Sequence, residues 1–167
     1  MSVKREIAQW DGKSASDIGD IYHRHCHDPL FIPAIITLVA NVSLQKGATW
    51  LLKRYLENKN SLADAEIAEL YNQLTAMEQW ESKLHILQCL PFIPIIKSRK
   101  KKVESFIRAC LLDDNKFVRA WAYNGFYELA VQYPEYKKET LQFFEMAMRD
   151  EAPSVKSRIR NIMKKGF

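Results

Sequence analysis

Apolar residues recur along almost the whole chain at the spacing that forms one face of an α-helix. One segment has small and apolar residues at positions i, i+4, i+7, i+8 and i+11: Val118, Ala122, Gly125, Phe126 and Leu129. This spacing places all five side chains on the same side of a helix. No segment alternates apolar and polar residues over a length that would require a β-strand. The pattern predicts an all-α protein.

Two sets of landmark residues repeat along the chain with a period near 37 residues. The apolar residues that anchor each predicted second helix are separated by 36, 38 and 37 residues: Leu44, Trp80, Val118 and Val155. The apolar residues that end each predicted first helix are separated by 36, 37 and 37 residues: Leu38, Leu74, Leu111 and Met148. A period of this length indicates stacked helical hairpins, because one hairpin alone cannot bury its apolar face.

The period divides the chain into four predicted hairpins within one domain, residues 1–167. The hairpins are residues 29–60, 61–97, 98–134 and 135–167. Residues 1–28 are expected to form a capping segment, with a short helix that starts after Ser14 or Ser16. The last hairpin ends in a strongly cationic helix, which suits a terminal repeat with one face in water. We therefore expect the chain to be a complete array.

The repeat unit resembles a HEAT repeat most closely in residues 111–122, Leu-Leu-Asp-Asp-Asn-Lys-Phe-Val-Arg-Ala-Trp-Ala. HEAT units typically place an Asp in the turn between their helices and an Arg or Lys six residues later, after a β-branched residue. Asp113 with Arg119 fits this pattern, and Asp150 with Lys156 repeats it. The carboxylate of such a pair is expected to cap the following helix and to contact the basic residue. The first two hairpins depart from the pattern, with Val39 and Gln45, and Thr75 and Glu81.

The resemblance covers about residues 29–165. It implies a right-handed α-α superhelix of about four HEAT-like hairpins. The same fold is a general scaffold that hosts many functions, so the resemblance implies no particular activity.

Charge divides the chain into two unequal parts. Residues 1–80 carry 8 Lys and Arg against 10 Asp and Glu, whereas residues 81–167 carry 17 against 10. In the HEAT family the second helices line a concave groove. By resemblance, the equivalent second-helix positions would place a basic and aromatic patch there: Arg119, Tyr123, Tyr127, Lys156, Arg160 and Lys164. Cations beside aromatic rings suit acidic peptides and stacked bases equally. The alternative interpretation is that the two tyrosines pack partly in the core and the cations are only solvated.

Two functions follow from this patch. The first is a protein-interaction scaffold or adaptor whose concave groove binds an acidic partner. The second is nucleic-acid binding, because some HEAT-like proteins are DNA glycosylases for alkylated bases and residues 117–122 have a faint similarity to their repeats. A structural subunit that joins a larger complex through its first hairpins is a third interpretation. In each case the partner would be distinguished by the salt dependence of binding.

The chain lacks the motifs of covalent, nucleotide-dependent and metal-dependent catalysis. It has no G-x-S-x-G, P-loop, G-x-G-x-x-G or H-E-x-x-H, and we expect neither enzyme activity nor a cofactor. The segment His23–Asp28 holds three histidines at alternate positions, which would share a face only if it were extended. We expect a polar turn there and no metal site. Lys97–Lys102 carries five cations in six residues and is expected to be a solvated loop or helix start, with phosphate contact as the alternative.

The cysteines and the N-terminus indicate where the protein works. The chain has an odd number of cysteines, and they are widely spaced, as expected of reduced thiols: Cys26, Cys89 and Cys110. The start of the chain lacks the apolar run of a signal peptide, and no apolar stretch is long enough to span a bilayer. These features predict a cytoplasmic protein with no membrane contact.

Overall fold

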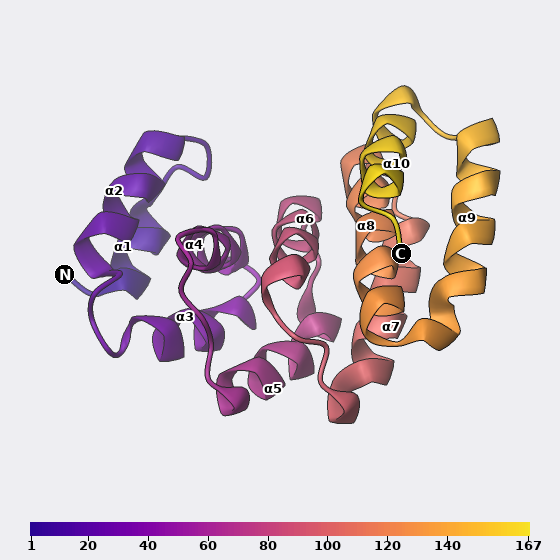
Figure 1. The fold of residues 1–167 in the computed structure, drawn as a ribbon. Coiled ribbons are helices and arrows are strands. Elements are labelled where there is room, and N and C mark those ends of the chain that lie inside the picture. The colour runs from indigo at the N-terminus through magenta and orange to yellow at the C-terminus, as the bar shows by residue number, and fades with distance from the viewer. The chain divides into compact units, whose positions relative to one another are not determined.

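The computed structural model describes residues 1–167, and every regular element in it is helical. It contains ten α-helices and four short 3-10 helices and no β-strand, which confirms the predicted all-α class. None of the helices combines the length and the apolar composition needed to cross a membrane. The chain forms two compact units, Met1–Ile93 and Pro94–Phe167 (Figure 1).

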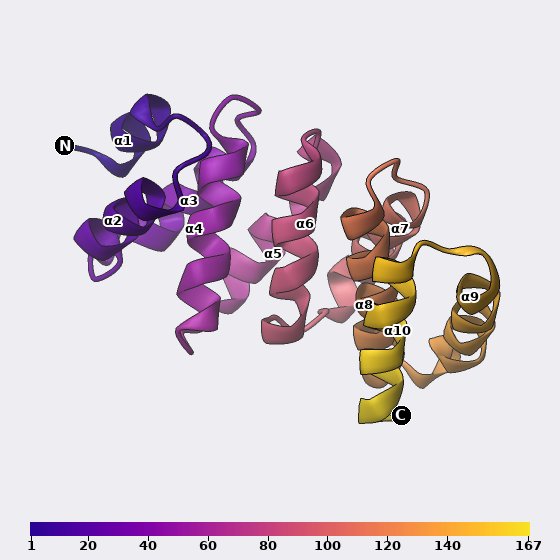
Figure 2. The same ribbon diagram turned by 90° about the horizontal axis from the view of Figure 1, so that it is seen from above.

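The first unit contains two helices that cover a hairpin and two further helices beside it. Its elements are α1 (Val3–Gln9), α2 (Ala15–His25), α3 (Phe31–Val39), α4 (Gln45–Glu57), α5 (Asp64–Asn72), η1 (Leu74–Ala76), α6 (Trp80–Cys89) and η2 (Leu90–Phe92). Helix α3 packs on α4, while α1 packs on α3 and α2 packs on α4. Helix α5 lies against α3, and α6 lies along α4 (Figure 2). The second helices of the first two predicted hairpins are therefore neighbours.

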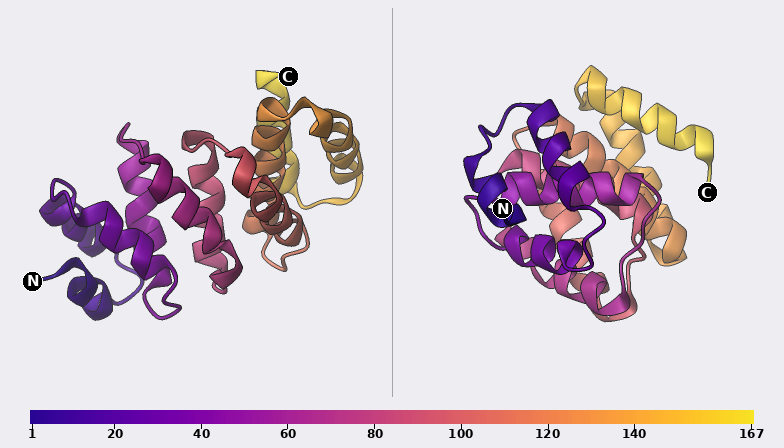
Figure 3. Two further views of the ribbon diagram at one scale, coloured as in Figure 1. Left: turned by 90° about the horizontal axis from the view of Figure 1, so that it is seen from below. Right: turned by 90° about the vertical axis from the view of Figure 1, so that its left-hand side faces the viewer.

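The second unit is built around α8. Its elements are η3 (Lys97–Arg99), α7 (Lys100–Leu111), α8 (Lys116–Gln132), η4 (Pro134–Tyr136), α9 (Lys137–Asp150) and α10 (Pro153–Lys165). Helix α8 packs against α7, α9 and α10 (Figure 3), and its contact with α10 is the most extensive of the three. Each predicted hairpin range thus contains two α-helices, and in this unit too the second helices lie side by side.

A column of buried positions repeats in the four second helices. Each helix buries three positions at i, i+4 and i+7: Gln45, Thr49 and Leu52 in α4; Ser82, Ile86 and Cys89 in α6; Val118, Ala122 and Gly125 in α8; Val155, Ile159 and Ile162 in α10. The first positions are separated by 37, 36 and 37 residues. The predicted period of about 37 residues is therefore present in the burial pattern.

The burial pattern contradicts the predicted anchor of the second hairpin. The sequence predicts Trp80, but the Trp80 side chain is 41% exposed, whereas Ser82, two residues later, is buried. In the first hairpin the predicted series that starts at Leu44 is buried, and so is the series that starts at Gln45, 37 residues before Ser82. A search for apolar residues cannot find these positions because their side chains are polar. Gln45 is completely buried because its amide group donates to the carbonyl oxygens of Val39 and Ala76, at 3.0 and 2.8 Å.

The N-terminal segment contains one predicted helix and one that the sequence did not reveal. Helix α2 starts after Ser14, whose hydroxyl oxygen accepts from the Asp17 amide at 3.1 Å, as the sequence predicted. Helix α1 was not predicted. It is only seven residues long, and it buries Val3 and Ile7, which stand one turn apart and face the first hairpin. So short a helix depends on this packing, because it is too short to be stable alone.

Candidate partner-binding surface

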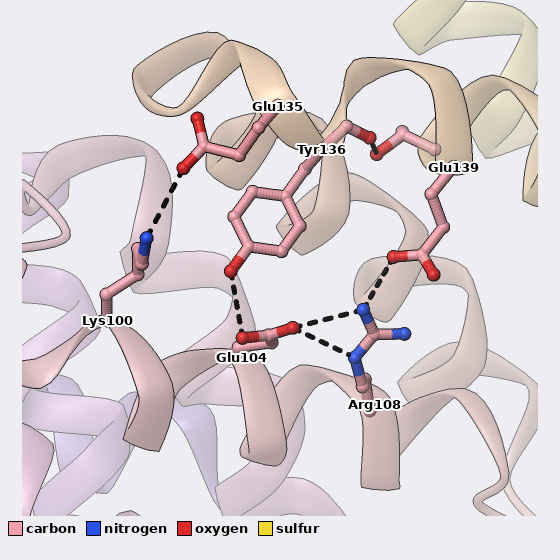
Figure 4. Close-up of polar contacts among 7 residues, drawn as sticks. Lys100, Glu104, Arg108, Glu135, Tyr136 and Glu139 are labelled. Atoms are coloured by element: carbon pink, nitrogen blue, oxygen red, sulfur yellow. Dashed lines mark hydrogen bonds and ion pairs between the residues drawn. The ribbon is translucent and has the colours of Figure 1, made fainter.

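Arg108 of α7 holds two carboxylates at the junction with α9 (Figure 4). Its Nε and Nη2 atoms donate to Glu104 Oε1 at 3.2 and 3.1 Å, and Nη2 also donates to Glu139 Oε1 at 2.5 Å. The hydrogen bond to Glu139, supported by the bond to Glu104, raises the pKa of Arg108 in spite of its partial burial. The Tyr136 hydroxyl donates to the second oxygen of Glu104 at 2.9 Å. These contacts tie the first helices of the last two hairpins together.

The protonation states of the groups in this network allow its hydrogen bonds to form at neutral pH. Burial raises the pKa of Tyr136 to about 12, and the hydrogen bond to Glu104 acts in the same direction. The phenol therefore stays protonated at neutral pH and acts as a donor. Next to it, Lys100 binds Glu135 at 3.3 Å (Figure 4). The Lys100 ammonium also lies 4.8 Å from the ring centroid of Tyr133. Every charged group of the network is thus satisfied by another.

Arg119, the first predicted binding residue, is engaged within the chain. Its Nε and Nη2 atoms donate to the two carboxylate oxygens of Glu151 at 2.9 and 3.2 Å. Its Nη1 atom donates to the backbone carbonyl oxygens of Asp113 and Asp114, both at 3.0 Å. The guanidinium thus joins the α7–α8 turn to the α9–α10 turn. The hydrogen bond to Glu151 raises the pKa of Arg119, which therefore remains charged.

The turn carboxylate of Asp113 does not cap α8 as the sequence predicted. Its Oδ1 atom accepts from the Asn115 amide at 2.8 Å, and Asn115 is the capping residue, accepting from the Phe117 and Val118 amides. Arg119 meets the carbonyl oxygen of Asp113. Arg119 therefore contacts Asp113 through the backbone carbonyl of Asp113. The ion pair of Arg119 is made with Glu151.

Tyr123 and Tyr127 face the last hairpin from α8. The Tyr123 side chain is only 9% exposed, and its ring lies 6.2 Å from that of Phe144 in α9. The Tyr127 hydroxyl donates to the Gly166 carbonyl at 2.9 Å, and its ring packs on Phe167 at 5.2 Å. Both tyrosines therefore contribute to the packing of α8 against the last hairpin, in line with the alternative interpretation.

Lys156, Arg160 and Lys164 form a stripe on the other side of α10. Arg158 stacks on Trp121 of α8, with its guanidinium 4.1 Å from the ring centroid, and so marks the side of α10 that faces α8. Residues two positions apart on a helix point about 200° apart, so Lys156 and Arg160 point away from α8. None of the three cations has a carboxylate partner within the chain. The six predicted residues therefore do not form one continuous patch, and the free cations lie on the outer flank of α10.

With the repeats aligned on the buried positions of the second helices, a basic residue occupies the same place in every second helix, a pattern that the apolar spacing did not reveal. The residue after each buried first position is basic in all four second helices: Lys46, Lys83, Arg119 and Lys156. These four residues are called the cation column. Lys46 binds Glu81 of the following hairpin at 3.1 Å, as Arg119 binds Glu151 of its own following hairpin. Aligning the repeats on basic residues in place of apolar ones would have found the column.

The histidine segment adopts the helical alternative. His23 and His25 both belong to α2, and His25 contacts the Glu6 carboxylate of α1, which Arg24 also binds at 2.8 Å. Burial acts to raise the pKa of Glu6, but the hydrogen bonds from His25 and Arg24 outweigh it and lower that pKa. No three His, Cys, Asp or Glu side chains come close enough to one another to hold a metal ion. Cys89 and Cys110 are buried on apolar helix faces, and burial keeps the Cys89 pKa well above its usual range.

Comparison of the chain with models of known families, with curated proteins and with solved structures finds no match. A function is therefore inferred from the geometry of the chain itself.

Proposed function

We propose that the chain is a HEAT-like solenoid of four hairpins, stacked in sequence order as a right-handed superhelix, and that it serves as a protein-interaction module. The cation column supports this proposal, because an Arg or Lys at one fixed position of each second helix is the pattern of the family. In each unit the second helices also lie side by side, as a stack requires. We place the module in the cytoplasm and assign it no catalytic role and no cofactor.

The observation that carries the proposal is an unfilled carboxylate position at Lys156. In α4 and α8 the equivalent cations, Lys46 and Arg119, each bind a glutamate from the following hairpin. Lys156 stands at the same position of α10 and is not within ion-pair distance of any carboxylate. An acidic partner that docks on the outer flank of α10 would supply the carboxylate that this position binds elsewhere in the chain.

Two further cations extend the same site. Arg160 and Lys164 follow Lys156 at intervals of four residues, so successive charges are about 6 Å apart along the helix axis. Like charges at this spacing repel one another, and an acidic partner would relieve the repulsion and gain charge-assisted hydrogen bonds. A helix with a Glu or Asp at every fourth residue has the same rise and would match the stripe. The proposed binding surface is therefore the outer flank of α10 in place of the concave groove expected from the family.

The test uses a fluorescent helical peptide with three glutamates spaced four residues apart, titrated into the full chain. Reversing two charges, with Arg160→Glu and Lys164→Glu, should weaken binding at least about tenfold, because attraction becomes repulsion. The matched control, Lys101→Glu with Lys102→Glu, makes the same change in net charge at two exposed positions of α7 and should change binding less than about twofold. Equal weakening by both pairs would show that only net charge matters, and the proposed surface would be abandoned.

A DNA titration separates the protein partner from the nucleic-acid alternative. A short duplex should bind the chain more weakly than the acidic peptide does. If the duplex binds more tightly, and its affinity falls steeply with salt as counterion release requires, the module is a nucleic-acid binder. Any protein captured from the native cell should show the same dependence on Arg160 and Lys164 as the peptide does.

A further inference from the structure

An open groove lies between the two helix–helix turns of the second unit. Its volume is about 560 Å³, which is within the usual range for ligand sites. One wall is the α7–α8 turn with Leu112 and Asp114, and the other is the end of α9 with Met146 and Asp150. The Arg119 guanidinium joins the two turns, so both walls are held in place by hydrogen bonds.

The walls of this groove are acidic although the unit is basic. The unit Pro94–Phe167 contains 16 Lys and Arg against 9 Asp and Glu. Four of those nine acidic residues line the groove: Asp113, Asp114, Asp150 and Glu151. Arg119 is the only cation in the lining, and it is paired with Glu151. The Asp114 and Asp150 side chains are exposed and make no ion pair, so their negative charge faces the solvent in the groove.

Apolar side chains stand between these carboxylates without a partner. Leu112 is 85% exposed and Met146 is 55% exposed, so each wall offers an apolar contact to a bound molecule. Placing a leucine almost entirely in water leaves its hydrophobic stabilisation unused until a partner covers it.

The floor supplies a third and independent observation. The Tyr123 side chain is nine-tenths buried and lines the groove, yet its hydroxyl makes no hydrogen bond within the protein. The hydroxyl is accessible from the groove, where it can form a hydrogen bond to a bound molecule.

We propose that this groove binds an extended peptide segment of another protein that carries alternating basic and bulky apolar residues. The basic side chains contact Asp114 and Asp150, and the apolar side chains cover Leu112 and Met146. The peptide backbone hydrogen-bonds to the Tyr123 hydroxyl. The occupant is basic because the groove is acidic, and this site is independent of the cationic stripe on α10.

The probe is the hexapeptide acetyl-Gly-Arg-Leu-Lys-Leu-Gly-amide, titrated into the full ¹⁵N-labelled chain and followed by NMR. We expect saturable shift changes at the amides of Leu112, Asp114, Met146 and Asp150. Neither the acidic peptide with Glu in place of Arg and Lys nor the basic peptide with Gly in place of both leucines should produce them. Equal shifts from either peptide, from spermidine or from Mg²⁺ would overturn the proposal.

Substitutions test the contribution of the carboxylates and of the Tyr123 hydroxyl separately. Asp114→Asn with Asp150→Asn should weaken hexapeptide binding at least about fivefold, because two exposed charge contacts are lost. The control Asp17→Asn with Asp20→Asn removes the same charge from exposed positions of α2 and should have no effect. Tyr123→Phe should weaken binding a few-fold at unchanged stability, because the hydroxyl has no partner in the free chain. Binding that is unchanged in the two aspartate variants, or a groove closed by self-association of the chain, would refute the proposed site.

Discussion

The tie between the two turns of the second unit predicts a large effect for Arg119→Gln. The guanidinium makes two hydrogen bonds to the Glu151 carboxylate and two to turn carbonyls, and its side chain is only 22% exposed. The variant loses these bonds and leaves Glu151, whose side chain is 16% exposed, without its partner. A charge-assisted bond in a partly buried site contributes about 1 kcal/mol after solvent screening, and an unpaired carboxylate adds a similar cost. We expect a loss of about 3 kcal/mol in the free energy of unfolding.

The assay is urea unfolding of the full chain, arranged as a double-mutant cycle with Glu151→Gln. If the two side chains act on each other, the double variant should be more stable than the sum of the single losses implies, by at least about 1 kcal/mol. The comparison removes effects that either variant has on other contacts. A coupling energy below about 0.5 kcal/mol, or a loss below about 1 kcal/mol for Arg119→Gln, would refute the inference that this pair joins the turns.

The Arg119–Glu151 pair should also change how the stability of the fold depends on pH in acid. Burial acts to raise the pKa of Glu151, but the hydrogen bonds from Arg119 and from the Ala152 amide outweigh it and lower that pKa. A carboxyl group whose pKa is lower in the folded than in the unfolded chain stabilises the fold above its unfolded pKa of about 4.3. This stabilisation is lost as the pH falls through the folded value. Arg119→Gln should therefore lose less stability than the natural sequence between about pH 5 and pH 3.

Two further predictions concern the packing of the first unit. A Cβ atom added at Gly47 would lie 2.6 Å from Cγ2 of Ile7. Gly47→Ala should therefore lower the free energy of unfolding in urea by a net of about 1 kcal/mol, despite the better helix propensity of alanine. The control Gly19→Ala, where no atom lies within 4 Å of the added Cβ, should be neutral or stabilising. Burial lowers the pKa of His85 to about 4 in the folded chain. As the pH falls, the His85 imidazole is therefore protonated in the unfolded chain before it is protonated in the folded chain. The free energy of unfolding should fall by about 2–3 kcal/mol as the pH drops from about 7 to about 4.5. His85→Gln should lack that loss, and an unchanged pH profile would contradict the assignment.

The sequence predicted the helices well because their apolar spacing is strong. Each predicted hairpin contains two α-helices, and the period near 37 residues returns in the buried positions. The register failed where buried positions are polar. Ser82 is fully buried, and Thr49 is buried with its hydroxyl 2.9 Å from Nδ1 of His85. Hydrophobic patterns cannot report such positions, because both side chains are polar. The Thr49 hydroxyl is buried with hydrogen bonds, whereas the Ser82 hydroxyl is buried without a partner.

Whether a predicted binding residue is buried or exposed depends on whether another helix covers its side of the helix. Equivalent positions in α8 and α10 point in equivalent directions, so Tyr123 and Arg160 share a place in the repeat. In α8 that side is covered by α9 and α10, and Tyr123 is consequently buried. In α10 the same side has no neighbour within the chain, and Arg160 is exposed. Sequence alignment identifies the direction of a side chain but not whether another hairpin occupies that direction.

The two proposed surfaces of the second unit carry opposite charges, and this determines how they must be tested. Added salt weakens both interactions, so a salt titration alone cannot tell which surface a partner uses. Charge reversal at Arg160 and Lys164 should weaken binding of an acidic partner and leave the basic hexapeptide unaffected. Neutralising Asp114 and Asp150 should weaken binding of the hexapeptide and leave the acidic partner unaffected. Because the groove is acidic and the stripe is basic, a single partner with separate acidic and basic segments would lose affinity in both variants. Such a result would mean that one protein spans both surfaces of this unit.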